Sequence, residues 1–277
     1  MTCRVVVRGL PGTQHGGMTV TQEPVGVLVR QWRERRHRSQ LDVSIAADLS
    51  ARHLSFIETG RSVPSRDMIE RLADELEVPL RERNTLHLAA GYAPRYRERP
   101  LADLGVARGA VEAVLSGHAP NPALAVNVHW DMLAANEPMQ GFLADVDPVL
   151  LVPPVNVLRA TLHPGGLGAR ILNYEQWRGH VVRRVRRQLH RTAAAGLADL
   201  LAEIEAYPAG GDRTAPGAPE NDLVAPLVLA GPHGVLSFHY ALTVFGAPRD
   251  VTLDEIAIET FFPADPDTAR ALRAMTG

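Results

Sequence analysis

Residues 39–65 read SQLDVSIAADLSARHLSFIETGRSVPS, and this stretch contains start and stop signals for two short helices separated by a tight turn. Ser39 and Ser50 each precede a helical pattern, and serine is a favoured N-cap because its hydroxyl accepts a bond from a free backbone N–H. Asp48 occupies the turn, and Gly60 stands where the second helix needs a left-handed residue to end. Two short helices joined in this way form the geometry that places the second helix in the major groove of DNA.

Helical periodicity continues on both sides of this stretch. Upstream, apolar residues recur from Val25 to Trp32 with the i, i+3, i+4, i+7 spacing of one helix face. Downstream, Pro64-Ser65 begins one further helix and Pro79 another, which ends near Gly91. The sequence therefore predicts an all-α helix-turn-helix domain of five helices. The predicted regions are a flexible extension at 1–22, this domain at 23–92, a linker at 93–103 and a second domain at 104–277.

The second domain mixes two periodicities. Helical spacing predicts helices at 106–117, at about 174–191, from 197 to 204 and at 265–275. Strict alternation of apolar and polar residues predicts strands at 124–130 and 236–245, and the segments 223–229 and 250–258 are expected sheet neighbours. The fold class predicted for this domain is mixed α/β, with an antiparallel sheet and helices on one side.

Charge is distributed unevenly along the chain. The net charge of the 277 residues is −2, yet residues 25–61 hold seven Arg against four acidic residues, a local balance of +3. A basic module beside an acidic body suggests a polyanionic partner for the module. No apolar run reaches the ~18 residues of a membrane span. The one cysteine, Cys3, excludes a disulfide within the chain. We expect no membrane partner and a cytoplasmic location on the nucleoid.

The second helix of the pair supplies the candidate contacts with double-stranded DNA. Arg52 can bond a guanine edge or a phosphate, Arg61 follows the helix where a phosphate would lie, and Gln40 begins the preceding helix, where an amide can meet a phosphate. Leu54 and Ile57 instead lock the two helices together. The predicted DNA-binding residues are Gln40, Ser50, Ala51, Arg52, His53, Ser55 and Arg61.

The run from Ser39 to Ser65 resembles the xenobiotic-response-element (XRE), Cro/C1-type helix-turn-helix of bacterial transcriptional regulators. Together with several later runs it is similar to the MmyB-like subfamily over nearly the whole chain from about residue 25. Those runs are Leu80-Arg81-Glu82-Arg83-Asn84, Ala89-Ala90-Gly91-Tyr92-Ala93-Pro94, Asn156-Val157-Leu158-Arg159, Leu162-His163-Pro164, Thr243-Val244-Phe245-Gly246 and Phe261-Phe262-Pro263-Ala264-Asp265. The resemblance implies an ion pair between Arg33 and Glu58 that supports the DNA-binding fold.

The same resemblance implies a PAS-like second domain that binds a small lipophilic, fatty-acid-like effector. An antiparallel sheet with helices on one face can leave a pocket between the layers, and the same side chains could equally form plain core. The candidate pocket residues are Val126, Trp130, Leu133, Phe142, Trp177, Val181, Phe238, Tyr240 and Leu242. The arginines between Arg183 and Arg191 lie opposite an apolar stripe, so we expect a solvated helix face there.

No catalytic signature is found in the sequence. Gly166-Leu167-Gly168 could begin a dinucleotide-binding loop, but the third glycine position is Ile171. Neither His233 with His239 nor His180 with His190 has the spacing of metal ligands. We therefore predict no enzyme activity, no catalytic residue, no metal and no cofactor.

The interpretation that follows is a sequence-specific transcriptional regulator. A homodimer on a partly palindromic operator is expected, because one small module reads few base pairs and two-fold pairing doubles them. Two alternatives stay open at this stage. One is a constitutive regulator whose second domain serves dimerisation only, and the other is a DNA-tethered enzyme.

Overall fold

The structure is a computed structural model that describes residues 6–7, 23–208, 226–231, 234–246 and 248–276. The described residues divide into two compact units: residues 23–99 with 248–254, and residues 6–7, 100–246 and 255–276. The sequence predicts contiguous domains, whereas the structure groups 248–254 with the N-terminal helices. The predicted flexible extension at 1–22 lies outside the described residues, except for β1 (Val6–Val7), which pairs with β3 and corrects that part of the prediction.

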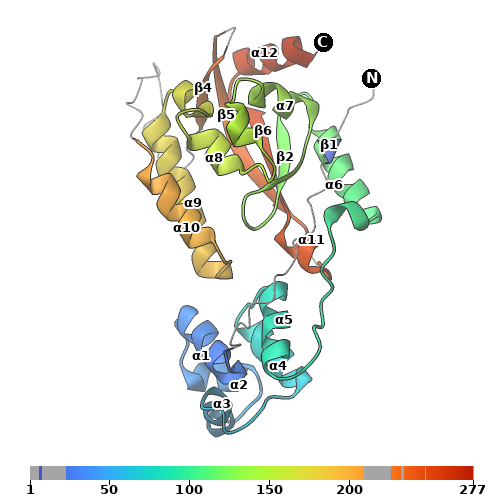
Figure 1. Ribbon diagram of the computed structural model, residues 1–277, viewed down its shortest axis with the longest axis vertical. Coiled ribbons are helices and arrows are strands. Elements are labelled where there is room, and N and C mark those ends of the chain that lie inside the picture. The colour runs from blue at the N-terminus through green and yellow to red at the C-terminus, as the bar shows by residue number, and fades with distance from the viewer. Residues whose placement is uncertain (1–5, 8–22, 209–225, 232–233, 247, 277) are drawn as a thin grey trace. The chain divides into compact units, whose positions relative to one another are not determined.

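The first unit begins with five helices, each drawn in Figure 1. They are α1 (Val25–Arg35), α2 (Gln40–Ala46), α3 (Ala51–Glu58), α4 (Arg66–Glu75) and α5 (Leu80–Ala89). Serine hydroxyls cap three of them, because Ser39 accepts from Asp42 N, Ser50 from His53 N and Ser65 from Met68 N. The left-handed positions also lie where the sequence places them, with φ of 55° at Asp48 and 73° at Gly60.

The backbones of helices α1 and α3 are in direct contact where the two helices cross. A Cβ atom at Gly26 would lie 2.1 Å from the carbonyl oxygen of Ile57, so only glycine fits at this crossing. Trp32, Leu54 and Ile69 are buried around it. The position of α3, the second helix of the helix-turn-helix pair, is therefore fixed by direct contact with α1.

The second unit is built on one antiparallel sheet with the strand order β1-β3-β2-β6-β5-β4. Every pair of neighbours in this order is antiparallel. The strands are β2 (Ala123–Val126), β3 (Met132–Ala135), β4 (Leu227–Gly231), β5 (Gly234–Val244) and β6 (Ala257–Pro263). The fold class predicted from the sequence, an all-α helix-turn-helix domain followed by a PAS-like α/β domain with an antiparallel sheet, is confirmed.

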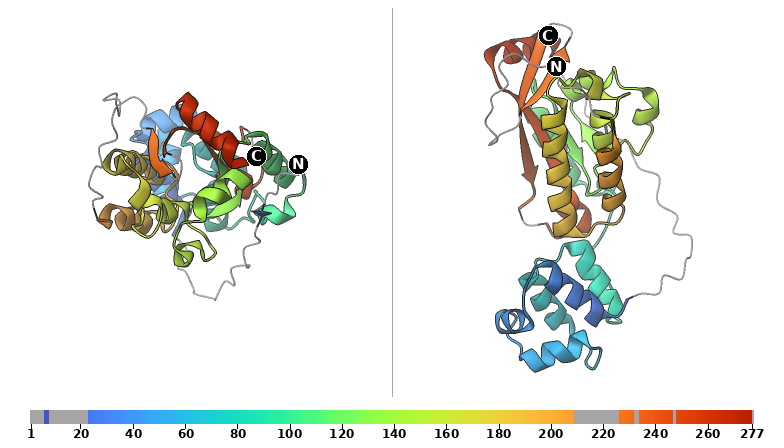
Figure 2. Two further views of the ribbon diagram at one scale, coloured as in Figure 1. Left: turned by 90° about the horizontal axis from the view of Figure 1, so that it is seen from above. Right: turned by 90° about the vertical axis from the view of Figure 1, so that its left-hand side faces the viewer.

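Helices surround this sheet, as Figures 1 and 2 show. They are α6 (Val106–Gly117), α7 (Glu137–Leu143), α8 (Val157–Leu162), α9 (Tyr174–Thr192), α10 (Leu197–Ala206) and α12 (Pro266–Thr276), and a short helix, α11 (Val251–Glu255), lies in the β5–β6 connection. Shorter 3-10 turns lie at Leu101–Asp103, Pro148–Leu151 and Leu167–Arg170. The main core cluster joins buried side chains of α7, α8, α9 and α10 to those of the sheet.

Two strand predictions are wrong in part, and side-chain hydrogen bonds explain both. The strand predicted at 124–130 ends at Val126, because the side-chain oxygen Oδ1 of Asn127 accepts from the backbone N–H groups of His129 and Asp131, each at 2.9 Å, and turns the chain. The strand predicted at 250–258 begins only at Ala257, because Asp250 accepts from Thr252 N at 3.1 Å and starts α11. Asparagine and aspartate bond their own backbone in this way.

A buried ion pair joins α1 to α3. Arg33 donates from Nε to Glu58 Oε1 at 2.7 Å and from Nη2 to Oε2 at 2.9 Å, and the Glu58 side chain is 2% exposed. Gln40 Nε2 donates to the same carboxylate at 2.8 Å. The hydrogen bond that Arg33 donates to the Glu58 carboxylate raises the pKa of Arg33. These bonds satisfy a charged group that burial would otherwise penalise.

Replacing Glu58 by Ala should destabilise the first unit strongly. The substitution leaves the Arg33 guanidinium partly buried without its carboxylate, an effect of about 3–5 kcal/mol on the free energy of unfolding. Amide hydrogen exchange of α1 and α3 in the full chain measures this change. Glu98→Ala is the matched control, because it removes an exposed pair with Arg81 in the same unit and should change little. Equal protection in the two variants would contradict the prediction.

Candidate DNA-binding surface and ligand cavity

The outer face of α3 carries the side chains available to a DNA groove. Ala51 and Arg52 are exposed, His53 and Ser55 are half-buried, and Leu54 faces the core. This alternation follows from the helical period, which turns the N-terminal residues of α3 outward while the residues that pack on α1 point inward.

Phe56 gathers two of the predicted arginines on this face. The Arg52 guanidinium lies 5.2 Å from the centre of the Phe56 ring, and the Arg61 guanidinium lies 5.8 Å from it. Cation–π contact holds both groups at the same surface without neutralising them. The structure thus brings Arg52, which precedes the ring, and Arg61, which follows the helix, to one patch of positive charge.

Two other predicted contacts have structural partners of their own. The amide of Gln40, predicted to meet a phosphate, instead donates to Glu58, so its N–H group at that bond is already used. The Ser50 hydroxyl accepts from His53 N as the cap of α3. His53 Nε2 lies 3.5 Å from Ser62 Oγ. The side chains of Gln40 and Ser50 therefore stabilise the positions of the helices through hydrogen bonds within the unit.

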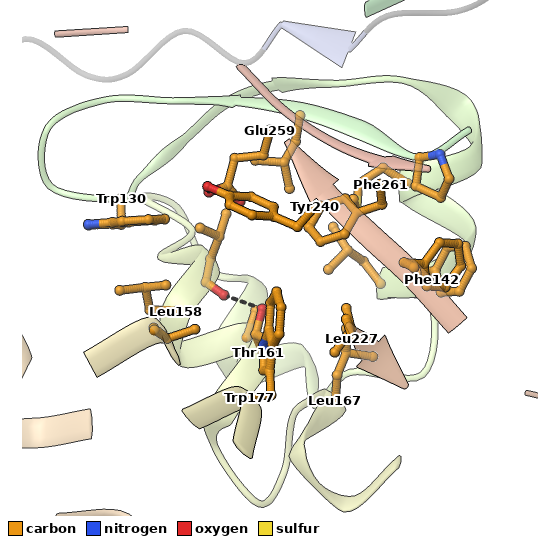
Figure 3. A pocket seen from close by; sticks show the side chains of 18 of the residues that line it. Trp130, Phe142, Leu158, Thr161, Leu167, Trp177, Leu227, Tyr240, Glu259 and Phe261 are labelled. Atoms are coloured by element: carbon orange, nitrogen blue, oxygen red, sulfur yellow. Dashed lines mark hydrogen bonds between the residues drawn. The ribbon is translucent and has the colours of Figure 1, made fainter. Parts of the chain in front are cut away.

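A cavity lies in the second unit between the sheet and helices α7, α8 and α9 (Figure 3). The empty space between its side chains amounts to about 820 Å³, counting the part that opens to solvent. Its walls are mostly apolar, as is typical of small-molecule sites. Six of the nine predicted pocket residues line it, namely Trp130, Phe142, Trp177, Val181, Phe238 and Tyr240.

The other three predicted pocket residues do not line the cavity, which corrects those assignments. Leu242 lies on β5 beyond the helices that cover the sheet and is 43% exposed. Val126 is buried in the core cluster rather than in the cavity wall. Leu133 is buried as well, but an irregularity in the β2–β3 register places its neighbour Met132 opposite Val126, and Met132 lines the cavity instead.

One end of the cavity is polar. Arg184 Nη1 donates to Glu259 Oε1 at 2.8 Å, and the Tyr240 hydroxyl donates to the same oxygen at 3.0 Å. The Arg184 guanidinium lies 4.2 Å from the ring centre of Trp130 and 4.6 Å from that of Tyr240. Burial raises the pKa of Glu259, whereas burial lowers the pKa of Arg184.

Arg184 contradicts the solvated face expected for the arginines of α9, because its side chain is only 18% exposed. The helical period contains the signal that would have separated it from its neighbours. Trp177, Val181, Arg184 and Gln188 recur at i, i+4, i+7 and i+11, so they share one stripe of the helix. Gln188 extends this stripe, since its side chain accepts from Trp130 Nε1 at 2.9 Å and donates to Val128 O at 2.9 Å.

Two buried nitrogens in the cavity wall lack a hydrogen-bond partner among the described residues. They are Trp177 Nε1 and His180 Nε2. The two rings are stacked, with centres 5.5 Å apart and planes at 18°. Burial, and secondarily the charge of Arg184, lowers the pKa of His180 and favours its neutral imidazole. A buried polar group without a partner marks a place where a ligand atom can bind.

Where the chain is described, no three His, Cys, Asp or Glu side chains gather as metal ligands would. Across these residues, too, no helix combines the length and the apolar character needed to cross a membrane.

A helix-turn-helix unit followed by a unit that contains an apolar cavity is the domain organisation of a ligand-responsive, DNA-binding transcription regulator. Residues 24–86 match the family of the helix-turn-helix domain. Residues 107–275, more than half of the chain, match the family described as the MmyB-like transcription regulator ligand binding domain, and the chain belongs to that family. Its partners are accordingly DNA and a small-molecule effector. A search of curated proteins gave no match.

Arg52 and Arg61 should differ in what they contribute to DNA binding. Arg52→Ala should relax specificity at one base pair and cost about 1–3 kcal/mol on a specific site, whereas Arg61→Ala should weaken all duplexes alike and lower the salt slope by about 1. Salt-matched titrations against a duplex selected from a random pool, and against the unselected pool, measure both effects. Arg108→Ala, in α6, is the control. An unchanged specificity ratio for Arg52→Ala would refute its assignment to a base edge.

Proposed function

We propose that this regulator binds DNA sequence-specifically as a homodimer on a partly palindromic operator, and that a small lipophilic, fatty-acid-like molecule in the cavity modulates this binding. The observation that carries the proposal is the mostly apolar cavity in the domain that the family match assigns to ligand binding. Neither catalysis nor a cofactor is part of the proposal. We expect the protein in the cytoplasm, on the nucleoid, because its DNA partner lies there.

The walls of the cavity favour a lipophilic ligand. Phe142, Leu158, Leu167 and Phe261 surround its centre, as Figure 3 shows. Removing apolar ligand surface from water contributes about 25 cal/mol per Å². An alkyl chain packed against these walls gains this contribution.

The β5–β6 connection supports modulation of DNA binding. Its residues 248–254 belong to the same compact unit as the helix-turn-helix. Val251 N donates to Arg97 O at 2.8 Å, Arg99 Nε donates to Asp250 Oδ2 at 3.1 Å, and Leu80 N donates to Asp254 Oδ2 at 3.1 Å. The strands on either side of this connection carry Tyr240 and Glu259 of the cavity wall.

A ligand that shifts β5 or β6 would therefore act on a segment bonded to α5. Such coupling between two sites typically amounts to about 1–3 kcal/mol, or 5- to 150-fold in affinity. The homodimer follows from the size of the module, since two recognition helices related by a two-fold axis read twice the number of base pairs.

The first experiment is native mass spectrometry of the purified protein, followed by organic extraction of whatever is bound. The expected result is a dimer that carries a lipophilic adduct in stoichiometric amount. Adding the extracted molecule back to the stripped protein should change its affinity for DNA. A clean dimer whose melting temperature no lipophile raises would instead favour a constitutive regulator that uses its second domain for dimerisation only.

Asp254→Ala should uncouple the two functions. Asp254 Oδ2 caps Leu80 N at the start of α5, where Pro79 offers no side-chain cap. Without this bond we expect unchanged ligand affinity and unchanged affinity of the stripped protein for DNA, but a smaller effect of the ligand on DNA binding. Fluorescence anisotropy with and without ligand measures the effect. Asp199→Ala, in the first turn of α10, is the matched control, and equal ligand effects in the two variants would exclude this route.

A further inference from the structure

We infer that the effector resembles a fatty acid in its alkyl chain only: it presents an uncharged carbonyl group to Trp177 and His180 in the cavity wall, as a lipophilic ketone, ester, amide or lactone does, and a fatty-acid anion is disfavoured. This inference deepens the proposed function and rests on it, because it concerns the chemistry of the same cavity. Three features of the cavity wall support the inference. The wall contains one buried pair of opposite charges, its hydroxyl groups already donate hydrogen bonds within the protein, and two of its ring nitrogens have no hydrogen-bond partner among the described residues.

The first feature is the balance of charge between Arg184 and Glu259. Their side chains are 18% and 7% exposed, and a bond of 2.8 Å joins them. They are the charged side chains that line the cavity in the described part of the chain, since Arg183 and Arg187 on the same helix are exposed. A carboxylate would add a second negative charge beside one guanidinium, and an uncompensated buried charge is costly.

The second feature is that the hydroxyl donors of the wall are already committed. Thr161 Oγ1 donates to Val157 O at 2.7 Å, the bond drawn in Figure 3. The Tyr240 hydroxyl donates to Glu259 at 3.0 Å. A ligand oxygen that used either hydrogen would have to break a bond inside the protein. These two hydroxyl groups are therefore not free to donate a hydrogen bond to a ligand.

The third feature is the pair of nitrogens without a partner. Trp177 Nε1 can only donate, and the neutral His180 imidazole donates from Nε2 in one of its tautomers. These residues lie three apart on α9, so their rings share one face of the helix. A carbonyl oxygen can accept from either nitrogen and brings no charge with it. Leaving such groups unpaired in a buried site costs free energy that this oxygen would recover.

The test compares two probes with the same alkyl chain, decanoic acid and 2-undecanone, in which a methyl group replaces the ionised oxygen. Isothermal titration of the stripped full-length protein at pH 7.5 measures both affinities. We expect the ketone to bind at least about tenfold tighter than the acid, as an uncompensated charge worth 1.4 kcal/mol or more requires. Trp177→Phe, which keeps the ring stack, should weaken ketone binding about three- to tenfold.

Glu259→Gln tests the role of charge separately. This substitution keeps the shape of the side chain and a hydrogen-bond acceptor but leaves Arg184 without a counter-charge. The acid should then gain on the ketone, and the order of the two affinities should reverse. Glu175→Gln is the matched control on α9, because Glu175 pairs with Arg178 outside the cavity wall and the wild-type order should persist.

The outcomes separate the inference from the function on which it rests. Tighter binding of the acid by the wild-type protein, or a Glu259→Gln variant that leaves the ratio unchanged, overturns the carbonyl inference and leaves the effector function standing. Binding of neither probe by any variant overturns both. If Glu259→Gln does not fold, the wild-type ratio and Trp177→Phe still decide the question.

Discussion

The bond between Arg184 and Glu259 ties helix α9 to strand β6 across the ligand cavity, and the arrangement of the cavity walls depends on it. Burial of either charge alone would cost several kcal/mol of desolvation free energy. The bond therefore helps to hold α9 against β6, whose register is set by its backbone pairing with β2 and β5. Trp130 and Tyr240 close on the guanidinium from two further segments and complete the polar end.

In the first unit, a buried ion pair likewise joins α1 to α3. There the carboxylate of Glu58 is bonded to Arg33 and Gln40, and the close approach at Gly26 leaves no freedom for the two helices to slide. The outer face of α3 is thus presented on a rigid support. The segment 248–254 connects β5 to β6 and is held in the same unit by the buried Val251 and by the bond from Val251 N to Arg97 O.

Local chemistry determined which parts of the fold could be predicted from the sequence. Ser39, Ser50 and Gly60 act on backbone within a few residues, so the helix-turn-helix and its limits follow from the sequence alone. The strand expected at 124–130 failed because Asn127 turns the chain through its own side chain, a choice that alternation of apolar residues does not report. The partner of Arg184 lies 75 residues away, so the sequence does not reveal the ion pair, and only the helical period that aligns Arg184 with Trp177 and Val181 separates it from the neighbouring arginines.

A balanced pair of charges in the cavity also bears on selectivity. A cavity lined only by apolar groups separates ligands by size alone, and one methylene group changes affinity little. A buried carboxylate such as Glu259 adds a penalty against anions of the same size and shape. If the effector is an uncharged carbonyl compound, such a cavity discriminates against free fatty-acid anions that share its alkyl chain. The buried carboxylate of Glu259 therefore contributes to discrimination against anionic ligands. Arg184 stabilises this carboxylate, and a second anion in the cavity would compete for the same guanidinium.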